Sequence, residues 1–251
     1  MASTIGAQLF TLRDSLKTPD EIRVTLKELA QLGYETVQVS ALGPIDPVEL
    51  RTICDGEGLR IVATHIRYDD IRESPQKVID DHGVWGCTHV GIGSMPADYR
   101  QDMARFATEA SQAARPLIDA GLTFNYHNHS FELQRFGDRP GLQILAEESD
   151  PEVFSFEVDV YWIQHGGGNP ASWLRALKDR MYVVHLKDMA MNGSEQLFAE
   201  VGEGNLEWPE ILQACKEASI EWYLIEQDVC QREPMESLGI SLKNLHAMGM
   251  R

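Results

Sequence analysis

Short apolar runs alternate with segments of helical periodicity along the whole chain, and this alternation constrains the fold most. The predicted strands cover residues 4–10, 34–39, 59–64, 88–92, 122–127, 153–158, 182–186 and 222–226. The predicted helices cover residues 19–31, 47–58, 76–85, 98–120, 141–148, 170–178, 208–218 and 234–248. Several strands are almost entirely apolar or β-branched, which is typical of parallel strands covered on both faces. Eight such units predict an α/β fold of the (β/α)8 TIM barrel type.

Glycines mark the points at which a helix gives way to the next strand. Gly33, Gly58, Gly86 and Gly121 all stand there, where a helix end favours a residue that takes positive φ without steric cost. The length of 251 residues is that of one barrel, so we expect residues 1–251 to form a single domain. A doubly wound open sheet shares the alternation. It does not need eight units, however, and no Gly-x-Gly-x-x-Gly follows the first strand.

The charge of the chain limits its partners. A formal net charge of −17 repels phosphate backbones and anionic lipid, so we expect neither nucleic acid nor a membrane as partner. No apolar run approaches the roughly 18 residues of a membrane span, and no basic stretch opens a signal peptide. The four cysteines form no Cys-x-x-Cys pair, which predicts reduced thiols in a cytoplasmic protein. The expected partner is therefore a small molecule. The sequence does not fix the oligomeric state, and a homo-oligomer is one of the alternatives.

Polar residues end most of the predicted strands. In a barrel of this kind the active site forms from the residues at the carboxyl ends of the strands. Seven of the eight strands end in a side chain that binds ligands or moves protons: Gln8, Gln38, His65, His127, Asp159, His185 and Glu226. Randomly placed polar residues rarely give such a pattern. It therefore predicts one polar site at the mouth of the barrel.

Three of these residues, together with Glu132, suggest a metal centre. Asp159, His185 and Glu226 end three later strands, and Glu132 follows the fifth. Three carboxylates with one imidazole suit Mn²⁺, Mg²⁺ or Co²⁺, with Zn²⁺ as an alternative and iron less suited. Asp159 has a competing interpretation as a helix cap. The first ligand is also open, because His127 or His129 stands close enough in sequence to replace Glu132.

Other residues near the strand ends are candidates for contact with a substrate. Lys187 follows His185 by two positions and so lies on the same face of the strand. His65 is interpreted as a second catalytic or contact group, with a structural histidine as the alternative. Further candidates for substrate binding are Gln8, His127, His129, Trp162 and Glu203. Packing is the competing interpretation for Trp162, and a plain loop is the competing interpretation for Glu203, which lies between two glycines.

Five short motifs together resemble one known family. They are Tyr-His-Asn-His-x-x-Glu at 126–132, Asp-Val-Tyr-Trp at 159–162, Val-His-Leu-Lys-Asp at 184–188, Val-Gly-Glu-Gly at 201–204 and Ile-Glu-Gln-Asp at 225–228. In these motifs the chain resembles the xylose isomerase-like sugar phosphate isomerases and epimerases over nearly its whole length. The resemblance implies a barrel with one divalent metal, often Mn²⁺. Its ligands would be Glu132, Asp159, His185 and Glu226.

The residues and the resemblance agree on proton abstraction next to a carbonyl. The metal would stabilise an enediolate, while Glu132 and Glu226 remove and return a proton on its two sides. His65 and Lys187 would complete the catalytic set as donors to substrate oxygens. The expected enzyme is thus a keto-sugar isomerase or epimerase. The alternatives are a lyase or dehydratase acting on a 3-keto-glycoside or inosose, and a sugar-binding barrel without turnover. The net charge argues against the related abasic-site endonucleases.

Overall fold

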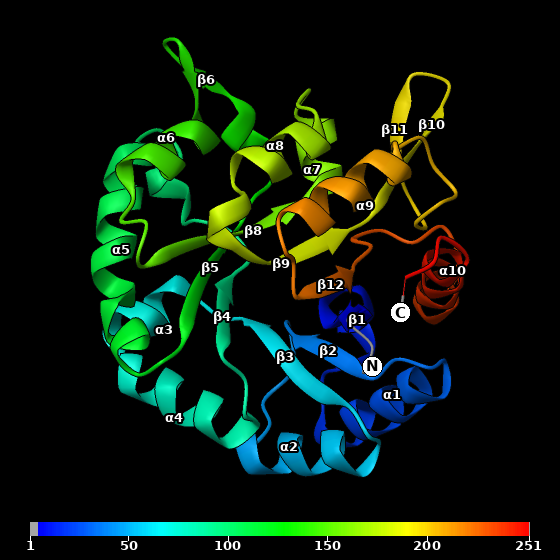
Figure 1. The fold of residues 1–251 in the computed structure, drawn as a ribbon. Helices are drawn as coiled ribbons and strands as arrows, with labels where there is room; N and C mark the ends of the chain where they lie inside the picture. Colours follow the sequence, from blue (N-terminus) through cyan, green and yellow to red (C-terminus); the bar gives the residue numbers. More distant parts are fainter. Residues whose placement is uncertain (1–4, 251) are drawn as a thin grey trace.

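The computed structural model describes residues 5–250, in which eight parallel strands close into a barrel (Figure 1). The barrel strands are β1 (Ile5–Gln8), β2 (Thr36–Val39), β3 (Arg60–His65), β4 (His89–Ile92), β5 (Thr123–His127), β8 (Phe154–Asp159), β9 (Met181–Leu186) and β12 (Trp222–Ile225). β1 pairs with both β2 and β12, which closes the ring. The predicted (β/α)8 barrel is confirmed. Thr4, where we expected the first strand to begin, lies outside the described residues.

Helices surround the barrel in the order expected for this fold (Figure 1). They are α1 (Pro19–Gln31), α2 (Pro47–Gly56), α4 (Pro75–Trp85), α5 (Met103–Asp119), α6 (Gly141–Glu148), α8 (Pro170–Ala176), α9 (Trp208–Glu217) and α10 (Pro234–Ala247). Their starts follow from local chemistry. At α1, for example, Thr18 and Glu21 form a capping box and proline occupies the first turn. The expected helix over 98–120 is shorter, because Asp102 caps it only before Met103.

Short additional elements, which we did not predict from the sequence, follow the carboxyl ends of four barrel strands. They are α3 (Tyr68–Glu73), α7 (Val160–His165), the hairpin of β6 (Arg135–Phe136) with β7 (Arg139–Pro140), and the hairpin of β10 (Asp188–Asn192) with β11 (Glu195–Ala199). Both hairpins extend beyond the ring of helices (Figure 1). These insertions therefore surround the end of the barrel at which the site was expected.

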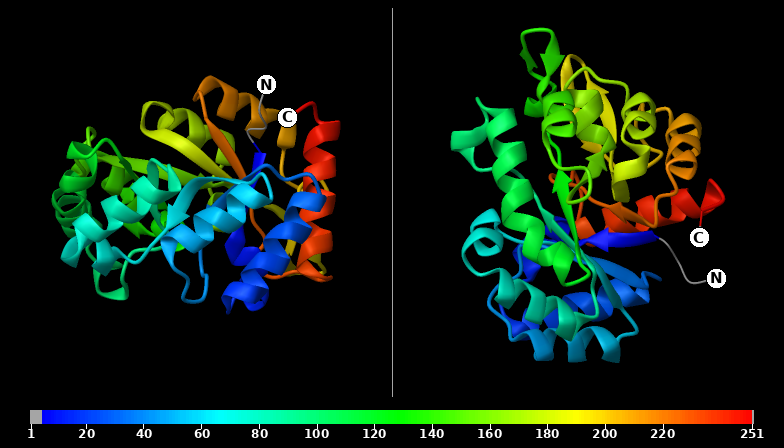
Figure 2. Two further views of the ribbon diagram at one scale, coloured as in Figure 1. Left: turned by 90° about the horizontal axis from the view of Figure 1, so that it is seen from below. Right: turned by 60° about the vertical axis from the view of Figure 1, so that its left-hand side comes forward.

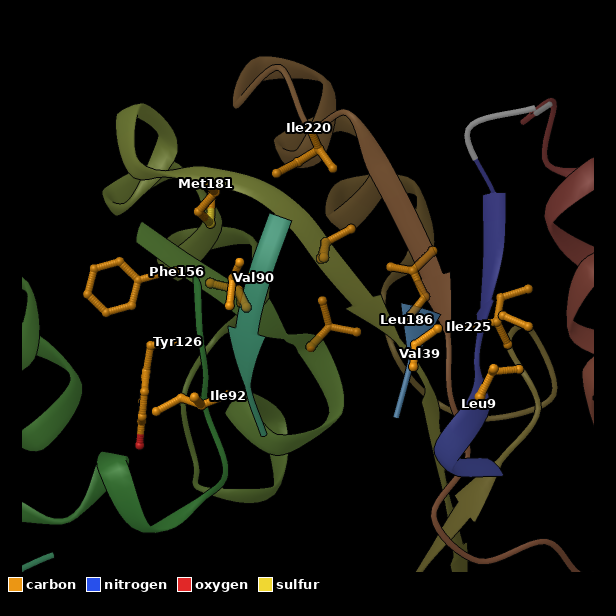
Figure 3. Packing of buried hydrophobic residues seen from close by; sticks show 14 of the residues in the cluster. Leu9, Val39, Val90, Ile92, Tyr126, Phe156, Met181, Leu186, Ile220 and Ile225 are labelled. Carbon is orange, nitrogen blue, oxygen red and sulfur yellow. The ribbon is translucent and has the colours of Figure 1, made fainter. Parts of the chain in front are cut away.

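The outward faces of the strands form the main core against the helices. Val90 and Ile92 of β4 lie beside Tyr126 of β5 and Phe156 of β8, all buried (Figure 3). Because side chains alternate along a strand, the residues between these positions point into the barrel. A separate apolar cluster of Val62, Ala63, Val183 and Leu224 packs on that inner side. The polar residues at the carboxyl ends continue the inner face.

The first and last units of the chain complete the ring together. α1 and α10 are neighbours on the outside of the barrel (Figures 1 and 2), and Tyr34, which follows α1, donates a hydrogen bond to the Leu238 carbonyl of α10 over 2.9 Å. Within residues 5–250, no helix combines the length and the apolar character that crossing a membrane requires.

Candidate active site

Four buried side chains converge at the carboxyl end of the barrel. They are His127 of β5, Asp159 of β8, His185 of β9 and Glu226, which follows β12. One nitrogen or oxygen from each lies within 4.8 Å of those of the others, a spacing that a single metal ion could bridge. The expectation that the strand ends form one polar site is met by these residues.

Asp159 has two functions, one for each carboxylate oxygen. Its Oδ1 accepts the backbone N–H of Trp162 over 2.9 Å and caps α7. Its Oδ2 lies 3.2 Å from Nε2 of His127 and faces the other three side chains. The Asn128 side chain accepts the backbone N–H of Asp159 over 3.0 Å, which fixes the strand end. The cap and the site residue, which competed as interpretations of the sequence, therefore coexist.

Hydrogen bonds set the orientation of both imidazoles in the group. Nδ1 of His127 donates to the carbonyl of Gly93 over 3.1 Å, so its Nε2 faces Asp159. Nδ1 of His185 lies 3.0 Å from Oε2 of Glu226. Burial favours the neutral form of His185, but Glu157 and Glu226 outweigh it and raise its pKa to about 10. Each ring thus presents one defined nitrogen to the group.

Lys187 brings a positive charge into direct contact with the group. Its Nζ lies 2.5 Å from Oε2 of Glu226, 2.7 Å from Oδ2 of Asp228 and 2.9 Å from Oδ2 of Asp159, and the side chain is fully buried. Burial disfavours the ammonium ion, yet these carboxylates hold the pKa of Lys187 well above its ordinary value. The same ammonium neutralises part of the charge that Glu226 and Asp228 place side by side.

The donor set fits a divalent cation. Two imidazoles and two carboxylates, all buried, are typical ligands of borderline first-row metals. The His127 ring also has the supporting hydrogen bond that metal-binding histidines commonly make on their second nitrogen.

Glu132, our expected first ligand, does not belong to this group, and His127 lies there instead. The fully buried carboxylate of Glu132 accepts the Tyr126 hydroxyl over 2.5 Å on Oε1 and the backbone N–H of His129 over 3.0 Å on Oε2. These contacts tie the turn after β5 to the strand. Glu132 thus serves the loop, and of the two alternatives named beside it His127 supplies the nitrogen.

The other predicted contact residues divide into two sets. Gln8 donates from Nε2 to Nδ1 of His65 over 3.2 Å, so both belong to the inner wall of the site. His129 lies between His127 and Trp162, with ring centroids 5.0 Å and 5.1 Å away, and burial lowers its pKa to about 3. Lys187 stands 5.7 Å from the Trp162 ring centroid, so this wall also adjoins the group.

Glu203 lies apart from these residues. It is exposed and accepts a hydrogen bond from Asn244 of α10 over 2.9 Å, so its carboxylate is directed to the outer helix. The loop around it is instead held by Asp188. That carboxylate accepts the backbone N–H groups of Gly202 and Gly204 over 2.9 and 3.1 Å. Glu203 therefore ties its loop to α10 and does not line the site.

Glu157 is the residue that sequence reasoning missed. It is fully buried and contacts Gln38, His65 and His185. Its position two residues before Asp159 puts both carboxylates on the same face of β8, and this spacing is the signal that could have revealed it.

A pH-dependent contribution to stability is expected from Glu132. Burial raises its pKa to about 7 from an ordinary 4.5, although hydrogen bonds from Tyr126 and His129 favour the charged form. A raised carboxyl pKa means that stabilisation is complete below pH 4.5 and is lost as the pH rises to about 7, by about 3 kcal/mol. We expect Glu132→Gln to remove this slope, so that urea unfolding favours the variant increasingly across that range. Parallel stability profiles of the two proteins would contradict the assignment.

Comparison with known proteins places this chain in a family. A model of the xylose isomerase-like TIM barrel family matches residues 26–243. Inosose dehydratase of Geobacillus kaustophilus is 23% identical over 198 residues, which span 68% of this chain and 62% of that relative. The match therefore covers less than two thirds of the relative's length.

Solved structures share the fold. A sugar phosphate isomerase/epimerase from Parabacteroides distasonis superposes with a TM-score of 0.80 at 22% identity, over 98% of this chain and 95% of that one. A probable 3-DHS dehydratase from Bacillus anthracis gives 0.72 at 12% identity, over 98% and 99%. The family model spans most of the barrel described above and confirms the resemblance that the motifs suggested. The chain belongs to the xylose isomerase-like TIM barrel family.

Proposed function

We propose that the enzyme is a divalent-metal-dependent sugar isomerase or epimerase that removes a proton from the carbon next to the carbonyl of a keto-sugar. The observation that carries this proposal is the convergence of His127, Asp159, His185 and Glu226 on one buried point. A cation held there would supply a Lewis acid for the carbonyl and its neighbouring hydroxyl, which makes the adjacent C–H more acidic.

The group contains His127 where the sequence predicted Glu132, and this changes the expected metal preference. Two imidazoles in place of one make the donor set softer than the one the sequence suggested. We propose Mn²⁺ as the cation, with Co²⁺ and Zn²⁺ now favoured over Mg²⁺, which prefers oxygen ligands and retains water.

Glu226 and Lys187 are the proposed proton carriers. Glu226 is held as a carboxylate by His185 and Lys187, both of which contact its Oε2, so it is suited to accept a proton. Lys187, held as an ammonium by the surrounding carboxylates, carries the proton that it would donate to a substrate oxygen. His65 and His129 line the same space and would orient the hydroxyls of the sugar.

Dehydration is the second candidate, and the position of Lys187 favours it. Epimerisation needs proton carriers on opposite faces of the enediolate, a role that we had expected Glu132 to share with Glu226. Glu132, however, binds the Tyr126 hydroxyl and does not reach the group. The proposed base and acid, Oε2 of Glu226 and Nζ of Lys187, lie 2.5 Å apart. Removal of a proton and protonation of a departing hydroxyl on the same face would use this pair.

Incubation in D₂O with ketoses, 3-keto-glucosides and inososes tests both proposals. Deuterium at the α-carbon of recovered substrate or its isomer, without loss of water, is the result expected of an isomerase or epimerase. Loss of water or of an aglycone identifies the elimination. Metal-stripped enzyme serves as the control and should exchange no deuterium. Failure of exchange with every substrate in the presence of Mn²⁺ would count against the proposed chemistry.

A further inference from the structure

A buried carboxylate beneath the site joins three strands of the barrel. Oε1 of Glu157 accepts hydrogen bonds from Nε2 of Gln38 over 2.9 Å, from Nε2 of His65 over 3.0 Å and from Nε2 of His185. These donors come from β2, β3 and β9, while Glu157 itself belongs to β8. Oε1 of Gln38 also lies 2.6 Å from Nε2 of His185. The inner nitrogen of His185 is thus enclosed by two oxygens.

The surroundings of Glu157 make its burial as a carboxylate cost free energy, which indicates that the residue has a role beyond packing. An ionised carboxylate in a barrel interior loses its hydration, and the neighbouring inner positions hold an apolar cluster. The chain also leaves room for it at Gly91. A Cβ there would lie 3.2 Å from Oε2 of Glu157, 3.0 Å from the His65 ring and 2.7 Å from the Thr64 carbonyl. An apolar side chain at position 157 would fill the space without these requirements.

We propose that Glu157 is a positioning residue for His185: it holds the Nε2–H and so fixes the ring with Nδ1 toward Glu226 and Asp159. A histidine can present either nitrogen to a metal, and the hydrogen bond on one nitrogen decides which is left. His65, Glu157 and His185 have the spacing of a metal group themselves. The ligand atoms of this second group are already joined by hydrogen bonds to one another, so they are not free to hold a cation. Glu157 therefore acts through His185. This assignment rests on the cation site proposed above.

Metal affinity provides the first test. We expect Glu157→Gln to lower the Mn²⁺ affinity of metal-stripped protein by about 10–100-fold, measured by calorimetry or by the electron paramagnetic resonance of free Mn²⁺. Glu200→Gln is the matched control, since Glu200 is also buried and hydrogen-bonded, by Ser237 over 2.7 Å, but lies outside the metal groups. Wild-type affinity in Glu157→Gln would overturn the proposal. If that variant does not fold, Glu157→Asp withdraws the carboxylate by one methylene and should lower the affinity likewise.

An NMR signal separates failure of this inference from failure of the cation site. The Nε2–H of His185, bonded to a buried carboxylate, should give a far-downfield proton resonance in metal-free protein. The resonance is assigned by its loss in His185→Asn, and its persistence in Glu226→Gln distinguishes it from that of the Nδ1–H, which faces Glu226. We expect Glu157→Gln to abolish or strongly shift it and Glu200→Gln to leave it in place. Its persistence in Glu157→Gln would refute the role of Glu157 even if the wild-type protein bound no Mn²⁺. Absence of binding of Mn²⁺, Co²⁺ and Zn²⁺ alike would refute the cation site.

Discussion

Glu226→Gln and Asp159→Asn are each expected to abolish stoichiometric metal binding and to lower kcat by at least about a thousandfold. Both changes remove a negative charge from the four-residue group while preserving the shape of the side chain. The amide oxygen introduced by Asp159→Asn would still accept the Trp162 N–H, so α7 should stay capped and the fold intact. Metal content by atomic emission, together with turnover of whichever substrate exchanges deuterium, measures the effect.

The control for Asp159→Asn is Asp46→Asn. Asp46 caps α2 in the same way, accepting the Val48 N–H over 2.9 Å, but it lies outside the metal groups. This variant should keep its metal and its activity. If Glu226→Gln and Asp159→Asn both retained full metal content, the proposed centre would be refuted.

Lys187→Met is expected to have the largest effect on the stability of metal-free protein. The change removes the ammonium that contacts Asp159, Glu226 and Asp228, and it leaves buried carboxylates facing one another. Breaking a buried ion pair in this way costs about 3–5 kcal/mol. For a chain of this size that loss lowers the melting temperature by about 10 °C.

Metal should reverse this loss, because a divalent cation neutralises the same carboxylates. We therefore expect Mn²⁺ to raise the melting temperature of Lys187→Met more than that of the wild type. The ammonium next to Asp159 and Glu226 repels an incoming cation, so its removal should also tighten Mn²⁺ binding, by at least about tenfold. Calorimetric melting with EDTA and with Mn²⁺ measures both effects.

Lys77→Met provides the comparison. Lys77 pairs with Asp81 on the surface, where such a pair contributes less than about 1 kcal/mol. A Lys187→Met protein that melted like the wild type in EDTA, or that gained no extra stability from Mn²⁺, would contradict the role of the ammonium.

The barrel could be predicted because its signals are local. α1, α2, α6, α8, α9 and α10 begin at the residues expected, five of them with proline in the first turn. α7 was missed because Asp159 ends β8 and caps the helix at once, with no polar linker between them. The β10–β11 hairpin has a signal that we overlooked. Gly193-Ser194, which connects the paired residues Asn192 and Glu195, is a typical two-residue hairpin turn, and Gly193 takes positive φ.

The limits of the site prediction follow from the same physics. Asp159 and His185 are the last inward-facing residues of their strands, and Glu226 follows directly, so strand periodicity places them. The same periodicity places His127 at the end of β5. Glu132 lies in the turn beyond that end, where a loop sets the direction of each side chain and sequence spacing carries no such information. The space that Gly91 leaves for the Glu157 side chain likewise depends on strands that meet only in the closed barrel.

Asp159 both caps α7 and belongs to the four-residue group, and this affects how related sequences should be interpreted. A descendant that lost its catalytic centre would still need an oxygen at this position to begin α7, and Asp, Asn, Ser or Thr would serve. Retention of an aspartate there is therefore weak evidence of catalysis during the divergence of such chains. The hydrogen bonds of Glu226 go to His185 and Lys187, both residues of the site itself. Its replacement in a related sequence should consequently mark the lineages in which turnover has been abandoned.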